Sequence, residues 1–265
     1  MRVLPWELRK LLAQTRVRIA FLTCLFGPPL LALVLGLQDG LPKDTLFGRH
    51  VHASGYALPL VVLGFASVWA FPLLTSLVAG DVFSSEDAHG TWPSLLTRSR
   101  SRSQVFTGKV LASVLSALAL LVTSAVSSLL AGLALAGSSP LVDLSGRELA
   151  PGRAAVLVLL SWMTAVPPLL AFTALACLLS VATRSSVVGV GGPVLVGLLM
   201  QLLSLVGALG SSANALLTTP FLAWRGLVRD DPYYGPLWQG ALVCLAWSAV
   251  CLVLARVVLL RRDVT

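Results

Sequence analysis

Hydrophobic and polar residues separate into long blocks along this chain and do not alternate with the period of a surface helix or strand. Six apolar stretches of about 20 residues or more are joined by shorter polar segments, and each is long enough to cross a bilayer as a helix. They cover about residues 19–37, 57–79, 110–136, 154–182, 187–209 and 237–256. We therefore predict an all-α integral membrane protein with six transmembrane helices, in which residues 1–265 form one transmembrane domain.

The composition supports this prediction and argues against a soluble domain. Charged residues make up 11% of the chain and hydrophobic residues 57%, and the mean hydropathy is +0.89. Soluble domains carry about 25% charged residues. The net charge of +8 does not indicate a nucleic-acid partner, because the bases are not gathered on an amphipathic face beside aromatic residues. Only three of the nineteen bases are Lys, and this bias toward Arg suggests a GC-rich bacterial genome.

The basic residues predict the orientation of the chain in the membrane. Thirteen of the nineteen Lys and Arg fall in the two terminal segments and in alternate connections, which the positive-inside rule assigns to the cytoplasm. We expect a multi-pass protein of the bacterial cytoplasmic (plasma) membrane with both termini in the cytoplasm. The stretch 19–37 is too long for a signal peptide, so we expect it to be kept as a membrane span.

The segment before the first span, about residues 3–16, has the spacing of an amphipathic helix. Four leucines share one face, and Arg9 and Lys10 lie opposite them, close to Trp6. Such a helix would lie along the inner membrane surface with its cations near anionic lipid headgroups. The alternative is a simple positively charged anchor.

The longest polar passage runs from Gly80 to Arg102, in a predicted cytoplasmic connection. A helix leaving the second span would reach about Glu86 and stop near Gly90, a residue suited to a helix C-terminus. Thr91 or Trp92 can then precede a second short helix that starts at Pro93. A solvated loop would explain the arginines, but it would not explain the acids or the apolar residues. We expect exposed apolar side chains beside these charges, which is typical of a protein-docking surface: Trp92, Leu95 and Leu96.

Signatures of intrinsic chemistry are missing from the sequence. The pair Gly108-Lys109 lacks the other residues of a phosphate-binding loop, and no metalloprotease or hydrolase motif occurs. His50 and His52 have no nearby Cys or Glu to complete a metal site. No ionisable side chain lies in the core of a span, although carriers driven by ions usually need one. We expect no catalytic residue, metal or cofactor in this chain, and an energy source elsewhere.

Two further segments have an unusual composition, namely an outer loop and the fifth span. The outer loop 211–236 holds two short apolar patches split by Pro220, with Phe221 and Trp224 in the second. They are either re-entrant pieces or part of an ordinary loop with an interfacial aromatic belt. The fifth span is rich in small residues that allow close helix approach, including Gly189 and Gly192. It could form a packing contact within the fold, a dimer seam or, with Gln201, part of a transport path.

The passage after the second span resembles the membrane subunit of type-2 ABC exporters. That family has an acidic residue, a Gly-Thr pair, a short helix ending in Leu-Leu, a basic stretch and a Lys that opens the third span. The matching residues here are Glu86, Gly90-Thr91, Leu95-Leu96, Arg98 to Arg102 and Gly108-Lys109. The N-terminal WELRKLL, the six-span layout and the apolar loop before the last span are similar too.

The resemblance implies a permease that pairs with a separate ATP-binding-cassette ATPase. Two ATPase copies would hold ATP and Mg²⁺ and would act on two permease copies, either identical or close paralogues. The coupling segment would be the residues Glu86, Gly90, Thr91, Trp92, Leu95, Leu96 and Arg98. The loop around Pro220 would be the family's re-entrant gate. Apolar spans favour a hydrophobic or amphipathic substrate. The alternatives are a non-transporting assembly or sensor subunit and an intramembrane enzyme, for which we find no catalytic pair.

Overall fold

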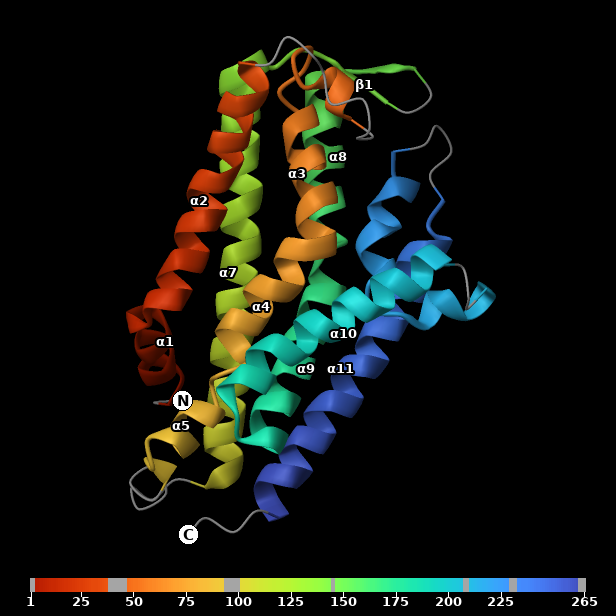
Figure 1. Cartoon of the computed structure of the whole chain (residues 1–265). Helices are drawn as coiled ribbons and strands as arrows, with labels where there is room; N and C mark the ends of the chain where they lie inside the picture. Colours follow the sequence, from red (N-terminus) through yellow and green to blue (C-terminus); the bar gives the residue numbers. More distant parts are fainter. Residues whose placement is uncertain are drawn as a thin grey trace.

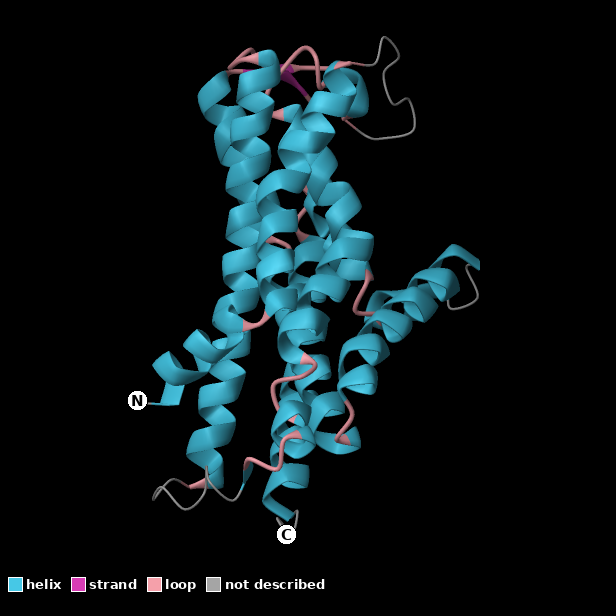
Figure 2. Ribbon diagram, turned by 60° about the vertical axis from the view of Figure 1, so that its left-hand side comes forward, coloured by secondary structure: helices cyan, strands magenta, loops and turns pink. Residues whose placement is uncertain are grey.

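The fold of the chain, seen in a computed structural model, is a bundle of long helices (Figure 1). The structure describes residues 3–37, 47–92, 101–143, 146–206, 210–228 and 233–261, with the backbone alone at 68, 211 and 212. Within these ranges turns and short loops join the helices, and the strands form one short antiparallel ribbon, which lies at the end of the bundle far from the N-terminus (Figure 2).

The elements follow one another along the chain with short connections. The α-helices are α1 (Val3–Ala13), α2 (Thr15–Gly36), α3 (Ala57–Phe65), α4 (Phe71–Ala79), α5 (Ser84–Ala88), α7 (Arg102–Ala136), α8 (Pro151–Met163), α9 (Val166–Thr183), α10 (Ser186–Val206) and α11 (Gly235–Arg261). A π-helical turn, η2 (Ala66–Ala70), joins α3 to α4, and the 3₁₀ segments are η1 (Gly48–His50), η3 (Gly210–Ala215) and η4 (Thr219–Gly226). The ribbon pairs β1 (Leu141–Val142) with β2 (Glu148–Leu149).

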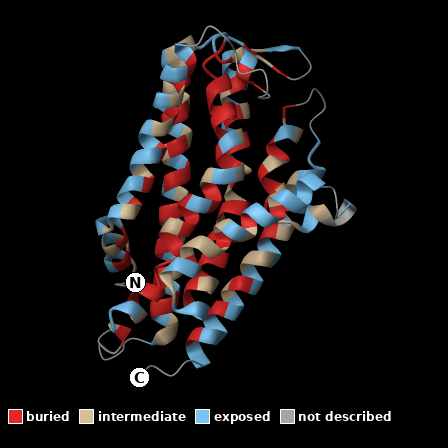
Figure 3. Ribbon diagram, in the orientation of Figure 1, coloured by how far each residue is buried: buried red, intermediate tan, exposed pale blue. Residues whose placement is uncertain are grey.

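Among the residues that the structure describes, five helical segments are long and apolar enough to cross a membrane. These candidate spans are α2, α7, the pair α8 and α9, α10, and α11. The remaining predicted stretch, 57–79, is helical from end to end, but η2 divides it into three short pieces. Helices α2, α10 and α11 carry much exposed apolar surface, whereas α3, α4 and α9 are largely buried (Figure 3). This distribution fits a membrane protein, whose outer apolar side chains face lipid.

Proline has different effects in the two apolar runs that contain a proline pair. Pro28 and Pro29 lie inside α2 without ending it. The single span predicted at 154–182 is instead two helices, because α8 ends at Met163 and α9 starts with Pro167 and Pro168 in its first turn. Proline has no N–H to donate to the preceding turn, so a break is favoured there. A tight turn joins α9 to α10, with Arg184 in the left-handed region at φ 57°.

The small residues of α10 make close contacts within the chain. A Cβ atom added at Gly189 would lie 1.9 Å from the Gly80 carbonyl oxygen, so only glycine allows this approach of α10 to the end of α4. A Cβ atom at Gly192 would lie 2.6 Å from Leu179 Cδ1 in α9. Gly189 and Gly192 therefore both make packing contacts within the fold, and Gln201 is half-buried further along α10.

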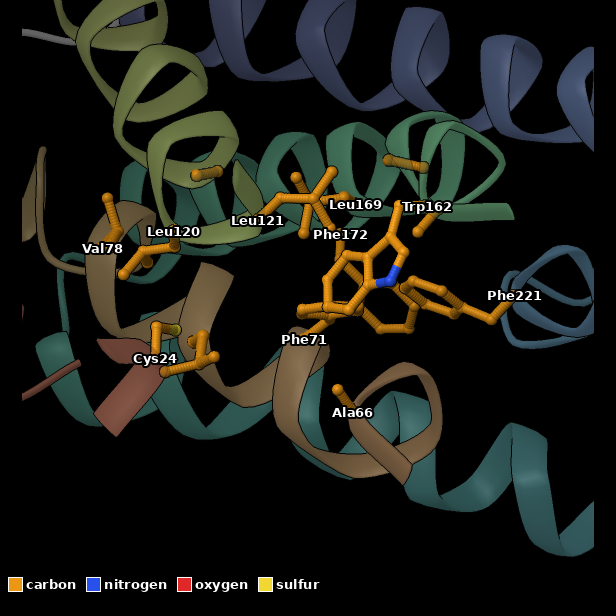
Figure 4. Close-up of a cluster of buried hydrophobic side chains, with 14 of the residues drawn as sticks. Cys24, Ala66, Phe71, Val78, Leu120, Leu121, Trp162, Leu169, Phe172 and Phe221 are labelled. Atoms are coloured by element: carbon orange, nitrogen blue, oxygen red, sulfur yellow. The ribbon is translucent and has the colours of Figure 1, made fainter. Parts of the chain in front are cut away.

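An aromatic cluster fills the centre of the bundle (Figure 4). Phe71 of α4 lies 6.0 Å from Trp162 of α8 and 6.1 Å from Phe221 of η4, measured between ring centroids. Phe172 of α9 stacks on Phe221 at 6.0 Å. The rings come from four separate segments, so their contacts hold η4 inside the bundle.

Candidate functional site

Charged side chains gather where α1, α5 and α7 meet, at the end of the bundle that also holds the end of α11 (Figure 1). We call this group the ionic cluster. Glu7 and Glu86 are each 2% exposed and Lys109 is fully buried. Its members are Glu7, Lys10, Glu86, Thr91 and Lys109.

Lys109 is the centre of the ionic cluster. Its Nζ donates to Glu86 Oε1 at 2.8 Å, to Glu7 Oε2 at 3.1 Å and to the Val82 carbonyl oxygen at 3.0 Å. An ammonium group has three protons, and here each has an acceptor. A buried charge is tolerated only when it is paired and hydrogen-bonded, and Lys109 meets both conditions.

The Glu86 carboxylate is held by three elements at once. Lys10 of α1 and Thr91 donate to it, in addition to Lys109 of α7. Burial alone would raise the pKa of Glu86, but the charge of Lys109 and the hydrogen bonds from Lys10, Lys109 and Thr91 lower that pKa from 4.5 to about 2. Glu86 is therefore an anion at neutral pH, and it fastens α5 to both α1 and α7.

The chain reverses direction directly after α5. The helix ends at Ala88, and Gly90 has φ +61°, a conformation that glycine adopts without a steric penalty. The Thr91 amide then donates to the Glu86 carbonyl oxygen at 3.0 Å. The glycine break predicted near Gly90 is confirmed, and it positions Thr91 to bond the Glu86 side chain as well.

A second polar contact fixes the other side of α5. Asp81 pairs with Arg16 of α2 and accepts hydrogen bonds from Ser186 of α10 and from Ser84 Oγ, the latter at 3.2 Å. In addition, the Ser84 amide donates to Ser180 Oγ of α9 at 3.1 Å. The segment between α4 and α5 is thus bonded to α2, α9 and α10, so that α5 contacts most of the bundle at this end.

Helix α1 turns its apolar face toward the protein. Leu11 is buried, and Val3 covers Gly108 of α7, where an added Cβ atom would lie 2.6 Å from Val3 Cγ1. Trp6 is 64% exposed and Arg9 is also exposed, whereas Lys10 points inward to Glu86. An amphipathic helix was correctly predicted, but it is shorter than the predicted 3–16, because α1 ends at Ala13 and α2 begins at Thr15. The opposition of Lys10 to the apolar face was wrong, because a buried carboxylate attracts it.

Only some of the predicted docking residues lie in the described part of the chain. Trp92 was expected to be exposed but is 5% exposed, and its Nε1 donates to Asp87 Oδ1 at 3.0 Å. Glu86 was expected in the partner-facing segment but is enclosed by its own cations. Leu95, Leu96 and Arg98 lie outside the described residues. Sequence reasoning missed Glu7, although an acid in a short basic helix was a signal that it needs a cation.

The predicted outer gate lies in η4 and contacts the interior of the bundle. Phe221 and Trp224 are each 1% exposed, and Trp224 lies 6.3 Å from Phe47 between ring centroids. Gly240 of α11 leaves room for Pro220, whose Cβ would lie 2.9 Å from a Cβ atom at position 240. Trp224 therefore does not belong to an exposed aromatic belt.

Among the described residues, no group of three or more His, Cys, Asp or Glu side chains could hold a metal ion.

Comparison with known proteins identifies a family for this chain. A family model described as ABC-2 family transporter protein matches residues 3–201, which include the whole ionic cluster. A search of curated proteins found no match.

Proposed function

Because the chain belongs to the ABC-2 family of transporter membrane proteins, we propose that it is the permease subunit of an ATP-binding-cassette exporter. Subunits of this family usually lack catalytic activity, and their ATPase is normally a separate subunit. The proposed assembly contains two ATPase copies, which hold ATP and Mg²⁺, and two permease copies that are identical or close paralogues.

The ionic cluster is the observation that carries the coupling part of this proposal. The segment 93–100, with Leu95, Leu96 and Arg98, joins α5 to α7 and is the proposed docking site for the ATPase. A force on that segment reaches Glu86 and Lys109 directly, since they stand on the two helices that flank it. Lys10 and Glu7 then carry the displacement to α1. The cluster joins these helices through short-range, buried ion pairs, so they would move together.

The proposed topology has six spans, with α3, η2 and α4 forming the second. Both termini and the ionic cluster lie on the cytoplasmic side of a bacterial plasma membrane, as the distribution of Lys and Arg favours. The segments η3 and η4 form a re-entrant outer gate. Irregular backbone is tolerated at membrane depth where protein covers it, and the buried Phe221 and Trp224 provide such cover.

The proposed substrate is hydrophobic or amphipathic. Charged residues of the candidate spans stand within about two turns of a helix end, as Arg16, Lys109 and Arg256 do. A path along these helices offers no charged group in its middle. A small hydrophilic ion would find no partner there, whereas an apolar molecule needs none.

The proposal is tested with the ATPase encoded beside this chain. We expect the two proteins to purify together, and the complex in liposomes to move an apolar fluorescent substrate in an ATP-dependent manner. Glu86→Gln should reduce transport while the ATPase stays bound, because the variant loses the link between α5 and its neighbours. Glu148→Gln, an exposed acid in β2, is the matched control.

Two results would contradict the proposal. If the Glu86→Gln variant transports substrate at the same rate as the Glu148→Gln variant, the ionic cluster does not take part in coupling. Failure of the ATPase to bind, or binding without any transport across a panel of apolar substrates, would favour a non-transporting membrane subunit.

A further inference from the structure

Two cavities lie end to end between α9 and α11. The inner one has a volume of about 360 Å³ and is lined by α7, α9 and α11. The outer one has a volume of about 350 Å³ and is lined by the α8–α9 break, η4 and the start of α11. Pro167 and Ala241 line both, so the two cavities adjoin. Together they are within the size range of small-molecule sites, and we call them the α9–α11 cavity.

Local sequence explains why the space is there. The break between α8 and α9 at Thr164 displaces the chain from a straight helical path, and the prolines that follow prevent its closure by regular hydrogen bonds. Small side chains line the cavity on both helices, namely Ala174 of α9 and Ala241 of α11. No large side chain fills the space that they leave.

The lining of the α9–α11 cavity is unfavourable for a charged or polar occupant. Among the residues that the structure describes, no Asp, Glu, Lys, Arg or His lines it. Its serine and threonine hydroxyls are already bonded within their own helical segments: Thr173 donates to the Leu169 carbonyl at 2.8 Å, Ser248 to the Cys244 carbonyl at 2.7 Å and Thr164 to the Ser161 carbonyl at 2.7 Å. An occupant therefore meets hydrocarbon and satisfied hydroxyls, which favours a hydrocarbon chain.

The length of the cavity matches one lipid chain. Along α11 it extends from Leu237 to Leu252, which is about 22 Å at the rise of an α-helix. One leaflet of the hydrocarbon core is about 15 Å thick, so a tilted or bent acyl chain would fit. A helix from a second copy is about 10 Å wide and needs more volume than the cavity has.

The two ends of the cavity differ. Tyr234 and Trp238 line its outer end and are 54% and 74% exposed, and such side chains collect where headgroups meet hydrocarbon. The opposite end of α11 lies beside α7, where Arg102 Nη1 donates to the Leu260 carbonyl at 3.3 Å. We propose that the α9–α11 cavity binds one acyl chain of a membrane lipid, with the lipid headgroup beside Tyr234 and Trp238.

This site does not depend on export and can be tested on the chain alone. The purified protein is placed in nanodiscs of phosphatidylethanolamine and phosphatidylglycerol that contain a phospholipid with a diazirine in its acyl chain. After irradiation, mass spectrometry of peptides should locate the label on cavity-lining residues of α9 and α11. Ala241→Phe fills the junction of the two cavities, and we expect labelling there to fall at least fivefold.

Matched variants separate the site from general lipid contact. Ala246→Phe adds the same ring on the same helix at an exposed position that lines neither cavity, and it should leave the labelling unchanged. Leu245→Trp narrows the inner cavity from a position that is already 69% exposed, so it removes no core contact. It should also reduce labelling, even if Ala241→Phe fails to fold.

Three outcomes would overturn the proposal. The first is equal labelling of the wild type and Leu245→Trp. The second is labelling of Leu130, an exposed lipid-facing residue of α7, as strong as labelling of the cavity. The third is a cross-link between two copies of the chain at α11, which would show that protein covers this face.

Discussion

Replacement of Lys109 by Met tests whether the ionic cluster stabilises the fold. The new side chain has a similar length and no charge, so the change removes three hydrogen bonds with little loss of volume. Glu7 and Glu86 stay buried, with only Lys10 left to balance them within the cluster. The variant therefore isolates the effect of one buried cation.

The expected loss of stability is large. Removing one partner of a buried ion pair costs about 3–5 kcal/mol, because the other charge is left without compensation. The total free energy of unfolding of a domain is about 5–15 kcal/mol, so this loss is a substantial part of it. Adding Glu86→Gln to Lys109→Met should restore part of the stability, with an interaction energy of about 0.5–3 kcal/mol.

The assay is denaturant unfolding of the detergent-solubilised protein, followed by circular dichroism. Arg153→Met replaces an exposed base at the start of α8 and should change the free energy of unfolding by less than about 0.5 kcal/mol. If Lys109→Met costs under about 1 kcal/mol, or if its effect and that of Glu86→Gln simply add, the assignment of Lys109 as the centre of the cluster is refuted.

The pH dependence gives an independent check. The pKa of Glu86 in the wild type is lowered to about 2, so its contribution to stability is present above its ordinary pKa of 4.5 and is lost as pH falls from 4.5 toward 2. Lys109→Met removes the charge of Lys109 and its hydrogen bond, whereas the hydrogen bonds from Lys10 and Thr91 remain, so the pKa of Glu86 should rise above its wild-type value. Unfolding curves should therefore show a smaller loss of stability from pH 5 to pH 2 in Lys109→Met than in the wild type.

The remaining predictions concern packing. Gly189→Ala should destabilise the protein strongly, because its Cβ would meet the Gly80 carbonyl oxygen. Gly191→Ala in the same helix has open space and should stabilise the protein by about 1 kcal/mol. Thermal melts of the two variants should shift in opposite directions. Phe221→Ala should cost about 3–5 kcal/mol by leaving a cavity among Phe71 and Phe172. A loss below about 1 kcal/mol in the free energy of unfolding by urea would show that η4 is held by other contacts.

Much of the architecture could be predicted from hydropathy alone. The predicted stretch 110–136 lies within α7, and 187–209 begins one residue after the start of α10. The backbone break near Gly90 was also predicted, because glycine suits a helix C-terminus. These features depend on local chemistry, because a bilayer requires continuous apolar helices and a left-handed turn favours particular residues.

The candidate site was harder to predict. Glu86 and the Gly-Thr pair were identified from the resemblance to a family, but their surroundings were expected to be exposed. Lys109 contacts Glu7 across a sequence separation of 102 residues, and no local sequence pattern predicts such a long-range contact. The prediction that Trp92 is exposed was wrong for the same reason, since burial of a side chain depends on which helices pack beside it.

The sequence by itself determined the apolar blocks, their turns and the concentration of basic residues on alternate connections, because each follows from a short run of residues and its solvent. Tertiary structure alone decided that Gly189 meets Gly80, that η4 enters the bundle, and that Lys109 joins Glu7 to Glu86. A buried charge is stable only beside its partner, and the partner is brought there by the packing of helices distant in sequence.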